Sequence, residues 1–216
     1  MKKTLFLSTV FVLLTFCLKA QNLSPEMQAV YDACLQLQSS INAGGTAGLR
    51  DANQQLKACN PAYFSSLHVV DEDQLPSVNG HFVFDYEFVD SLIVNHIVYD
   101  FAERYAERCA ERGTSSSGKD KVFMRTCMAG ASSSTQLIFR SRGHQELAVV
   151  AEPGGLITMR VHDTTNDKWY NDTKQVKKGQ PSRALVFDLP TDKRCTLEVE
   201  IINKSNENIS FVVIAN

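Results

Sequence analysis

The segment Cys195-Thr-Leu-Glu-Val-Glu-Ile-Ile202 places apolar side chains at every second position, with threonine or glutamate between them. Successive side chains of a β-strand point to opposite faces, so this alternation predicts a strand with one buried and one exposed face. Ile157-Thr-Met-Arg-Val-His162 alternates in the same way. The second half of the chain is therefore expected to form antiparallel sheet with one solvated face.

Several more segments around these two have strand-like composition and are separated by turn residues. The expected strands are 121–127, 136–141, 145–151, 156–162, 183–189, 195–202 and 209–215. Pro153-Gly-Gly155 and residues 203–208 are expected to join adjacent strands as hairpins. So many short strands with turns between them predict an antiparallel β-sandwich.

The first half of the chain has helical periodicity. Ser24-Pro25 is a strong helix start, and apolar residues then recur at three-to-four spacing until Gly44-Gly45. A second helix is expected over 47–58, and a third should begin at Asp85 and end at Gly113. The fold class is thus α+β, with a helical region over 21–113 that precedes the sandwich.

Two stretches rich in serine and glycine follow the helical region, at 114–118 and 130–134. The periodicity changes from helical to alternating after the first of them. We therefore expect a linker over 114–134 that could contain one short strand, and a sandwich over 135–216. The sequence leaves open whether the helical and sandwich regions share one core.

Residues 1–20 have the three parts of a cleavable signal peptide: a basic start, an apolar run and Ala20 at the cut. Cleavage there would make Gln21 the first mature residue. The apolar run is shorter than the roughly 20 residues that cross a bilayer, so we expect no membrane anchor in the mature chain. The protein is expected to be periplasmic or extracellular.

The charge balance excludes one class of partner. The chain has 22 basic and 24 acidic residues, a formal net charge of −2, and its leader carries only basic ones. Nucleic-acid binding needs clustered lysine and arginine to neutralise phosphates, and no long basic run occurs. We therefore expect no nucleic-acid partner.

Six cysteines are present, and Cys17 lies in the leader. Export makes disulfides feasible, and sequence proximity favours Cys34 with Cys59 and Cys109 with Cys127. The remaining cysteine would be unpaired or would bridge two chains. Alternatively, all of them are reduced and act as small buried hydrophobic residues.

The best candidate for a ligand site is a polar loop that contains the single tryptophan. Trp169 could stack on the apolar face of a sugar, with Tyr170 and Asn171 beside it. Alternatively, Trp169 folds back and plugs the end of the core. The same loop carries Asp163, Asp167 and, beyond Asn171, Asp172. These carboxylates could hold calcium, although such residues also dominate ordinary turns.

The sequence has no Gly-x-Ser-x-Gly elbow, and its serine clusters lie in linker-like stretches. The enzymatic alternative is a secreted hydrolase with a site between the helical and sandwich regions. Its candidate residues are His81, Asp85, His144 and Glu146.

The last eighty or so residues resemble a known class of secreted module. Leu147-Ala-Val-Val-Ala151, 156–163, 185–190 and 196–203 follow one another in an order similar to that of pre-peptidase C-terminal and jelly-roll β-sandwich modules. The Lys19-Ala-Gln21 ending of the leader also resembles exported proteins of Bacteroidetes. The first resemblance implies a binding or accessory module, and the second implies no function. We expect an exported, non-enzymatic protein of the cell envelope whose ligand is a glycan or an envelope protein. A purely structural envelope component is a further alternative.

Overall fold

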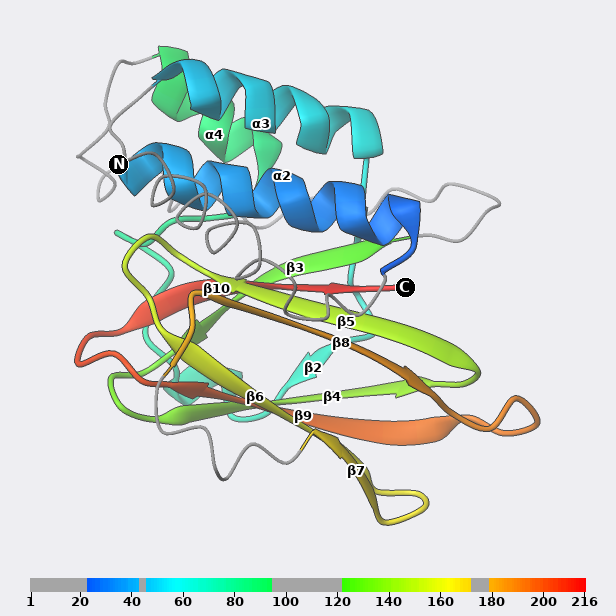
Figure 1. The fold of residues 1–216 in the computed structure, drawn as a ribbon. Helices are drawn as coiled ribbons and strands as arrows, with labels where there is room; N and C mark the ends of the chain where they lie inside the picture. The colour runs from blue at the N-terminus through cyan, green and yellow to red at the C-terminus, as the bar shows by residue number, and fades with distance from the viewer. Residues whose placement is uncertain (1–22, 43–45, 95–121, 172–178) are drawn as a thin grey trace, which may run out of the picture.

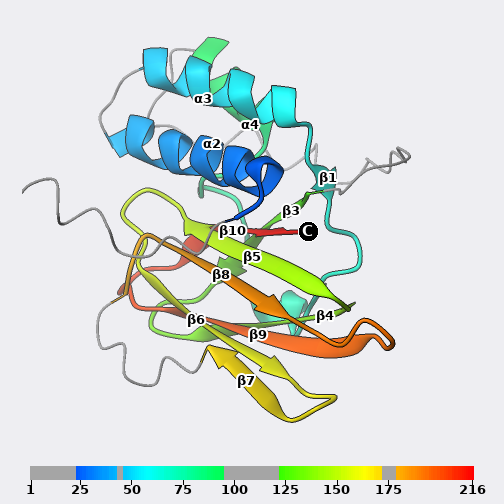
Figure 2. The same cartoon turned by 45° about the vertical axis from the view of Figure 1, so that its right-hand side comes forward.

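The computed structural model describes residues 23–42, 46–94, 122–171 and 179–216, which form a layer of helices and two sheets (Figures 1 and 2). The helices are α2 (Pro25–Asn42), α3 (Thr46–Cys59), α4 (Tyr86–Val94) and the short 3-10 helix η1 (Glu72–Gln74). Ser24 caps α2 as expected, because its Oγ accepts a hydrogen bond from the Met27 amide at 3.4 Å.

Ten strands among the described residues form two five-stranded sheets, which confirms the α+β class and the β-sandwich. Sheet A consists, in spatial order, of β1 (Ala62–Tyr63), β3 (Phe123–Ala129), β10 (Ile209–Ala215), β5 (His144–Ala151) and β8 (Ser182–Asp188). Sheet B consists of β2 (His68–Val69), β4 (Ser134–Ser141), β9 (Cys195–Asn203), β6 (Ile157–Asp163) and β7 (Lys168–Asn171). The strand pairs are antiparallel except β1 with β3.

The prediction that these two turns form hairpins is wrong. The turn at 153–155 carries the chain from β5 in sheet A to β6 in sheet B, and residues 204–208 carry it from β9 in sheet B to β10 in sheet A. From β3 to β10, β6 and β7 are the one pair of consecutive described strands within a single sheet. Turn residues reverse the chain, but they do not determine which strand the next one will pair with.

The helical layer lies on the outer face of sheet A (Figure 1). Residues of α2, α3 and α4 bury their apolar faces together with Ala148, Val150, Val212 and Ile214 of β5 and β10. Gln38 of α2 donates a 2.7 Å hydrogen bond to the backbone carbonyl of Ala151. Sheet A is therefore covered on both faces, and the helices and the sandwich share it.

The domain boundaries differ from those expected from sequence. β1 and β2 lie within the region expected to be helical, whereas β3 corresponds to the strand expected at 121–127 inside the linker. β3 occupies an inner position of sheet A, between β1 and β10. The expected leader, the third helix beyond Val94 and the first part of the linker fall outside the described residues.

Candidate functional site

The single tryptophan of the chain lies on the outer face of sheet B. Trp169 belongs to the edge strand β7, where it is paired with His162 of β6. Trp169 is 42% exposed, whereas its neighbour Tyr170 packs against the core between the sheets. A large aromatic side chain that is kept at the surface suits ligand binding.

Two side chains of β6 hold the indole ring in place. The His162 ring is stacked on Trp169 with 4.3 Å between centroids and 6° between planes, and Arg160 Cζ lies 4.4 Å from the indole centroid. Arg160 Nη1 donates to Glu200 Oε2 at 2.8 Å, and His162 Nε2 lies 2.9 Å from Asp167 Oδ1. The indole is thus oriented before any ligand arrives, which lowers the entropic cost of binding.

The other two residues of the predicted ligand site have structural contacts. Tyr170 packs on Phe187 with 4.4 Å between ring centroids and closes the end of the sandwich. The interpretation that Trp169 plugs the core is therefore wrong, because Tyr170 occupies that position. Asn171 donates a 2.9 Å hydrogen bond to the Met159 carbonyl and extends the pairing of β7 with β6.

The turn between β6 and β7 is stabilised by its own hydrogen bonds. Asp163 Oδ1 accepts from the amides of Thr165 and Asn166, and Oδ2 accepts from Asn166 Nδ2. Burial alone would raise the pKa of Asp163, but these hydrogen bonds lower it below the usual range. Asp167 faces His162, and Asp172 lies outside the described residues.

No group of three histidine, cysteine, aspartate or glutamate side chains within the described residues could hold a metal ion. The hydrogen bonds of Asp163 account for its place in the turn without a cation. Because Asp172 belongs to the undescribed stretch, the calcium site stays a prediction.

The described cysteines are free thiols, so a Cys34–Cys59 disulfide is absent from this structure. Cys34 and Cys127 are buried, and burial raises the pKa of both thiols, that of Cys127 to about 12. Cys109, the expected partner of Cys127, lies outside the described residues. Thiols with raised pKa values are poor nucleophiles at neutral pH, which suits the alternative of small buried hydrophobic residues.

Glu146, near the start of β5, fastens α2 to sheet A. Its two carboxylate oxygens accept hydrogen bonds from the Ser24 amide at 2.9 Å and from Ser24 Oγ at 2.7 Å. His144 Nε2 lies 3.5 Å from Glu146, and His144 Nδ1 lies 2.8 Å from Asp188. The serine hydroxyl donates to the carboxylate and not to the histidine, so this cluster lacks the nucleophile–base contact of a hydrolase.

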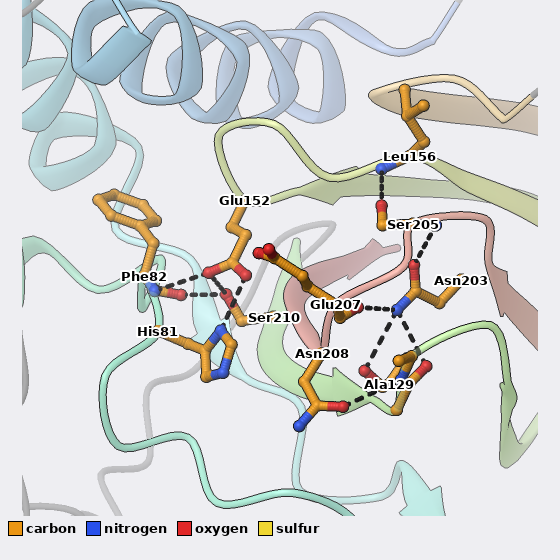
Figure 3. A network of polar contacts seen from close by, with 12 residues as sticks. His81, Phe82, Ala129, Glu152, Leu156, Asn203, Ser205, Glu207, Asn208 and Ser210 are labelled. Carbon is orange, nitrogen blue, oxygen red and sulfur yellow. Dashed lines mark hydrogen bonds and ion pairs between the residues drawn. The ribbon is translucent and has the colours of Figure 1, made fainter.

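Glu152, just beyond β5, fastens a second segment of the chain to the sheet (Figure 3). Its carboxylate lies 2.8 Å from His81 Nδ1 and accepts hydrogen bonds from the Phe82 amide and from Ser210 Oγ. Ser210 Oγ is also close enough to donate to the Phe82 carbonyl. The hydrogen bond to Glu152 raises the pKa of His81 above its ordinary value.

The four residues of the predicted hydrolase site are not brought together. His81 lies with Glu152 at one end of β5, while His144 and Glu146 lie at the other, roughly 20 Å away at the usual rise of a strand. Asp85 accepts a 2.7 Å hydrogen bond from the Glu87 amide at the start of α4. These residues make separate structural contacts and do not surround one reacting centre.

Sequence analysis missed the role of Arg160. The alternation of 157–162 predicts that its side chain points outward, but its contact with the indole depends on β7, where the sequence predicts a loop. The turn residues of 163–167 between two short runs were the available signal for a hairpin.

The described residues thus define the class of the protein: an α+β β-sandwich with helices on one sheet and a solvated second sheet. No helix among them is both long enough and apolar enough to span a membrane. No known family model and no curated protein matches the sequence.

Several solved structures have partial likeness to the chain. One is a mitogen derived from Yersinia pseudotuberculosis, with 12% identity over 44% of this chain and 85% of that chain and a TM-score of 0.35. Another is Peruvianin-I, a cysteine peptidase from Thevetia peruviana latex, with 13% identity over 72% of this chain and 91% of that chain and a TM-score of 0.22.

A third is a β-glucosidase from Kluyveromyces marxianus in complex with glucose, with 13% identity over 37% of this chain and 10% of that chain and a TM-score of 0.21. Likenesses this weak carry no functional argument. The function must be inferred from the residues themselves.

Proposed function

We propose that this chain is an exported, non-enzymatic binding or accessory protein of the cell envelope, and that it binds a glycan on the outer face of sheet B around Trp169. The observation that carries the proposal is the indole ring, which is 42% exposed yet is held by His162 and Arg160. The part of this rigid ring that His162 and Arg160 leave exposed can contact the apolar face of a sugar at little entropic cost.

The surroundings of Trp169 offer the polar groups that such a ligand needs. Glu198 and Glu200 lie on the same face of sheet B, on the strand beside His162 and Arg160. Their carboxylates can accept hydrogen bonds from hydroxyl groups, and Arg160 can donate. The aromatic and polar groups together match the chemistry of a sugar, which has an apolar face and a hydroxylated rim.

Tryptophan fluorescence tests the proposal, because Trp169 is the sole tryptophan of the chain. The purified chain would be titrated with cellohexaose, xylohexaose, maltohexaose and laminarihexaose, and with oligogalacturonate as a charged glycan. At least one should cause a saturable change in emission, together with a rise in melting temperature. An unchanged emission and melting temperature with all of these glycans would exclude glycan binding and would favour an envelope protein as the partner.

A further inference from the structure

The outer face of sheet B carries a row of cross-strand neighbours that begins at Trp169. The registers of the sheet pair Trp169 with His162, His162 with Glu198, Glu198 with Ile138, and Ile138 with His68. The row crosses all five strands of the sheet. At the usual spacing between strands it is roughly 19 Å long.

The row contains both apolar and hydrogen-bonding groups. Trp169 and Ile138 present apolar surface, and Glu198 lies between them on β9 with its side chain 33% exposed. His68 is exposed at the far end, on the edge strand β2. Helices α2, α3 and α4 lie on the opposite side of the molecule, against sheet A (Figure 2). The row is thus a path for an elongated ligand that runs perpendicular to the strands.

The charges beside the row are compensated within the protein. Arg160 is paired with Glu200 at 2.8 Å, and His162 has Asp167 at 2.9 Å and Glu198 at 3.9 Å. Arg160 is therefore neutralised, and the exposed Arg140, two residues from Ile138 on β4, offsets part of the charge of the remaining carboxylates. The row thus carries little net charge, which suits an uncharged ligand.

We infer that sheet B binds a neutral oligosaccharide of several sugar units along this row, with one end against the exposed part of Trp169 and the other near His68. The inference rests on the proposed function, and it adds the direction, the length and the charge of the ligand. A single sugar would contact Trp169 and His162 alone, whereas a longer chain would also reach Glu198, Ile138 and His68.

The test is a length series, with cello-oligosaccharides and malto-oligosaccharides of one to six units titrated at low and at high salt. Affinity, followed by Trp169 fluorescence and by calorimetry, should rise by at least tenfold from one unit to the longest chains in one of the series. It should change less than twofold with salt, because no charged group of the ligand is involved. Oligogalacturonate should bind at least tenfold more weakly than the best neutral chain.

Two variants locate the far end of the row. His68→Ala should weaken binding of the hexamer several-fold and leave binding of the dimer unchanged. Arg142→Ala is the matched control, because Arg142 is exposed just beyond the end of β4 and outside the row. It should change neither affinity.

The outcomes separate this inference from the proposed function. Equal affinity for one unit and for six, or loss of dimer binding in His68→Ala, would show that the ligand does not follow the row. The proposed binding site at Trp169 would still stand. Tighter binding of oligogalacturonate than of the neutral chains would contradict the inference that the ligand is uncharged. No response of Trp169 to any neutral or charged saccharide would overturn both.

Discussion

The Glu152 carboxylate connects three separate parts of the chain at the residue scale. It accepts hydrogen bonds from the Phe82 amide and from Ser210 Oγ, and it is paired with His81. The side chains of His81 and Glu152 are 22% and 13% exposed. Glu152→Ala leaves the Phe82 amide without this acceptor, so we expect a loss of about 2–3 kcal/mol in the free energy of unfolding. Urea denaturation measures it.

Glu207→Ala is the control for this prediction, because Glu207 is exposed and lies near the same cluster (Figure 3). It should change the stability by less than about 0.5 kcal/mol. Equal effects of the two substitutions would show that the network contributes nothing specific.

The raised pKa of His81 makes part of the stability depend on pH. The hydrogen bond to Glu152 is the main cause, desolvation opposes it, and the charges of Glu152 and Glu207 add to it. Because the folded pKa lies above the unfolded value of 6.5, this contribution is fully present below pH 6.5 and is lost as the pH rises through the folded pKa. His144 acts with the same sign, since its hydrogen bond to Asp188 raises its pKa.

The difference between wild type and His81→Gln isolates the first of these two groups. Wild type should lose more stability than His81→Gln when urea denaturation is repeated at rising pH from 5.5 to 8.5. His68→Gln, at an exposed histidine on β2, should behave as wild type. Parallel pH profiles for wild type and His81→Gln would contradict the role given to Glu152.

The site was predictable only in part at this scale. The composition of the loop identified Trp169, but Trp169 and Tyr170 are adjacent, and a strand must send one outward and one inward. Which of them faces solvent depends on the register of β7 with β6, including the irregularity between Val161 and His162. Local sequence does not contain that register.

The two sheets differ in burial at the scale of the strand. β10 is buried at every position, whereas β9 alternates between buried and half-buried residues. Val212→Asp would place a carboxylate between sheet A and the helices, so we expect a loss of more than about 4 kcal/mol. Ile202→Asp, on the outer face of sheet B, should cost about 1 kcal/mol. Similar losses of unfolding free energy for both variants in urea denaturation would contradict the finding that the helices cover sheet A and leave sheet B uncovered.

The sequence predicts where the strands lie better than it predicts which strands pair with one another. Cys195–Asn203 and Ile209–Ala215 lie within a residue of their expected positions, because period-two and apolar patterns are local. The continuous apolar runs of β5 and β10 were also a signal for burial on both faces, and hence for helices on sheet A. The crossing of 153–155 between sheets was not predictable, since a reversal has the same turn chemistry in either case.

The helices and the sandwich should unfold as one unit at the scale of the whole molecule. Both faces of sheet A are buried, one by sheet B and one by the helices, so neither part keeps its core without the other. Far-UV circular dichroism reports chiefly on the helices, and Trp169 fluorescence reports on sheet B. We expect the two urea transitions to coincide. A helical transition at clearly lower urea would show two independent domains.

The central claim is that the Trp169 face of sheet B binds glycan, and a glycan array tests it most directly. Wild type, Trp169→Ala and Tyr63→Ala would be compared on one array, since Tyr63 is another exposed aromatic residue, 58% exposed, on β1 of sheet A. The account predicts the same bound glycans for wild type and Tyr63→Ala and none for Trp169→Ala, with all three melting within a few degrees. An unchanged binding pattern in Trp169→Ala, or no binding by wild type, would contradict it.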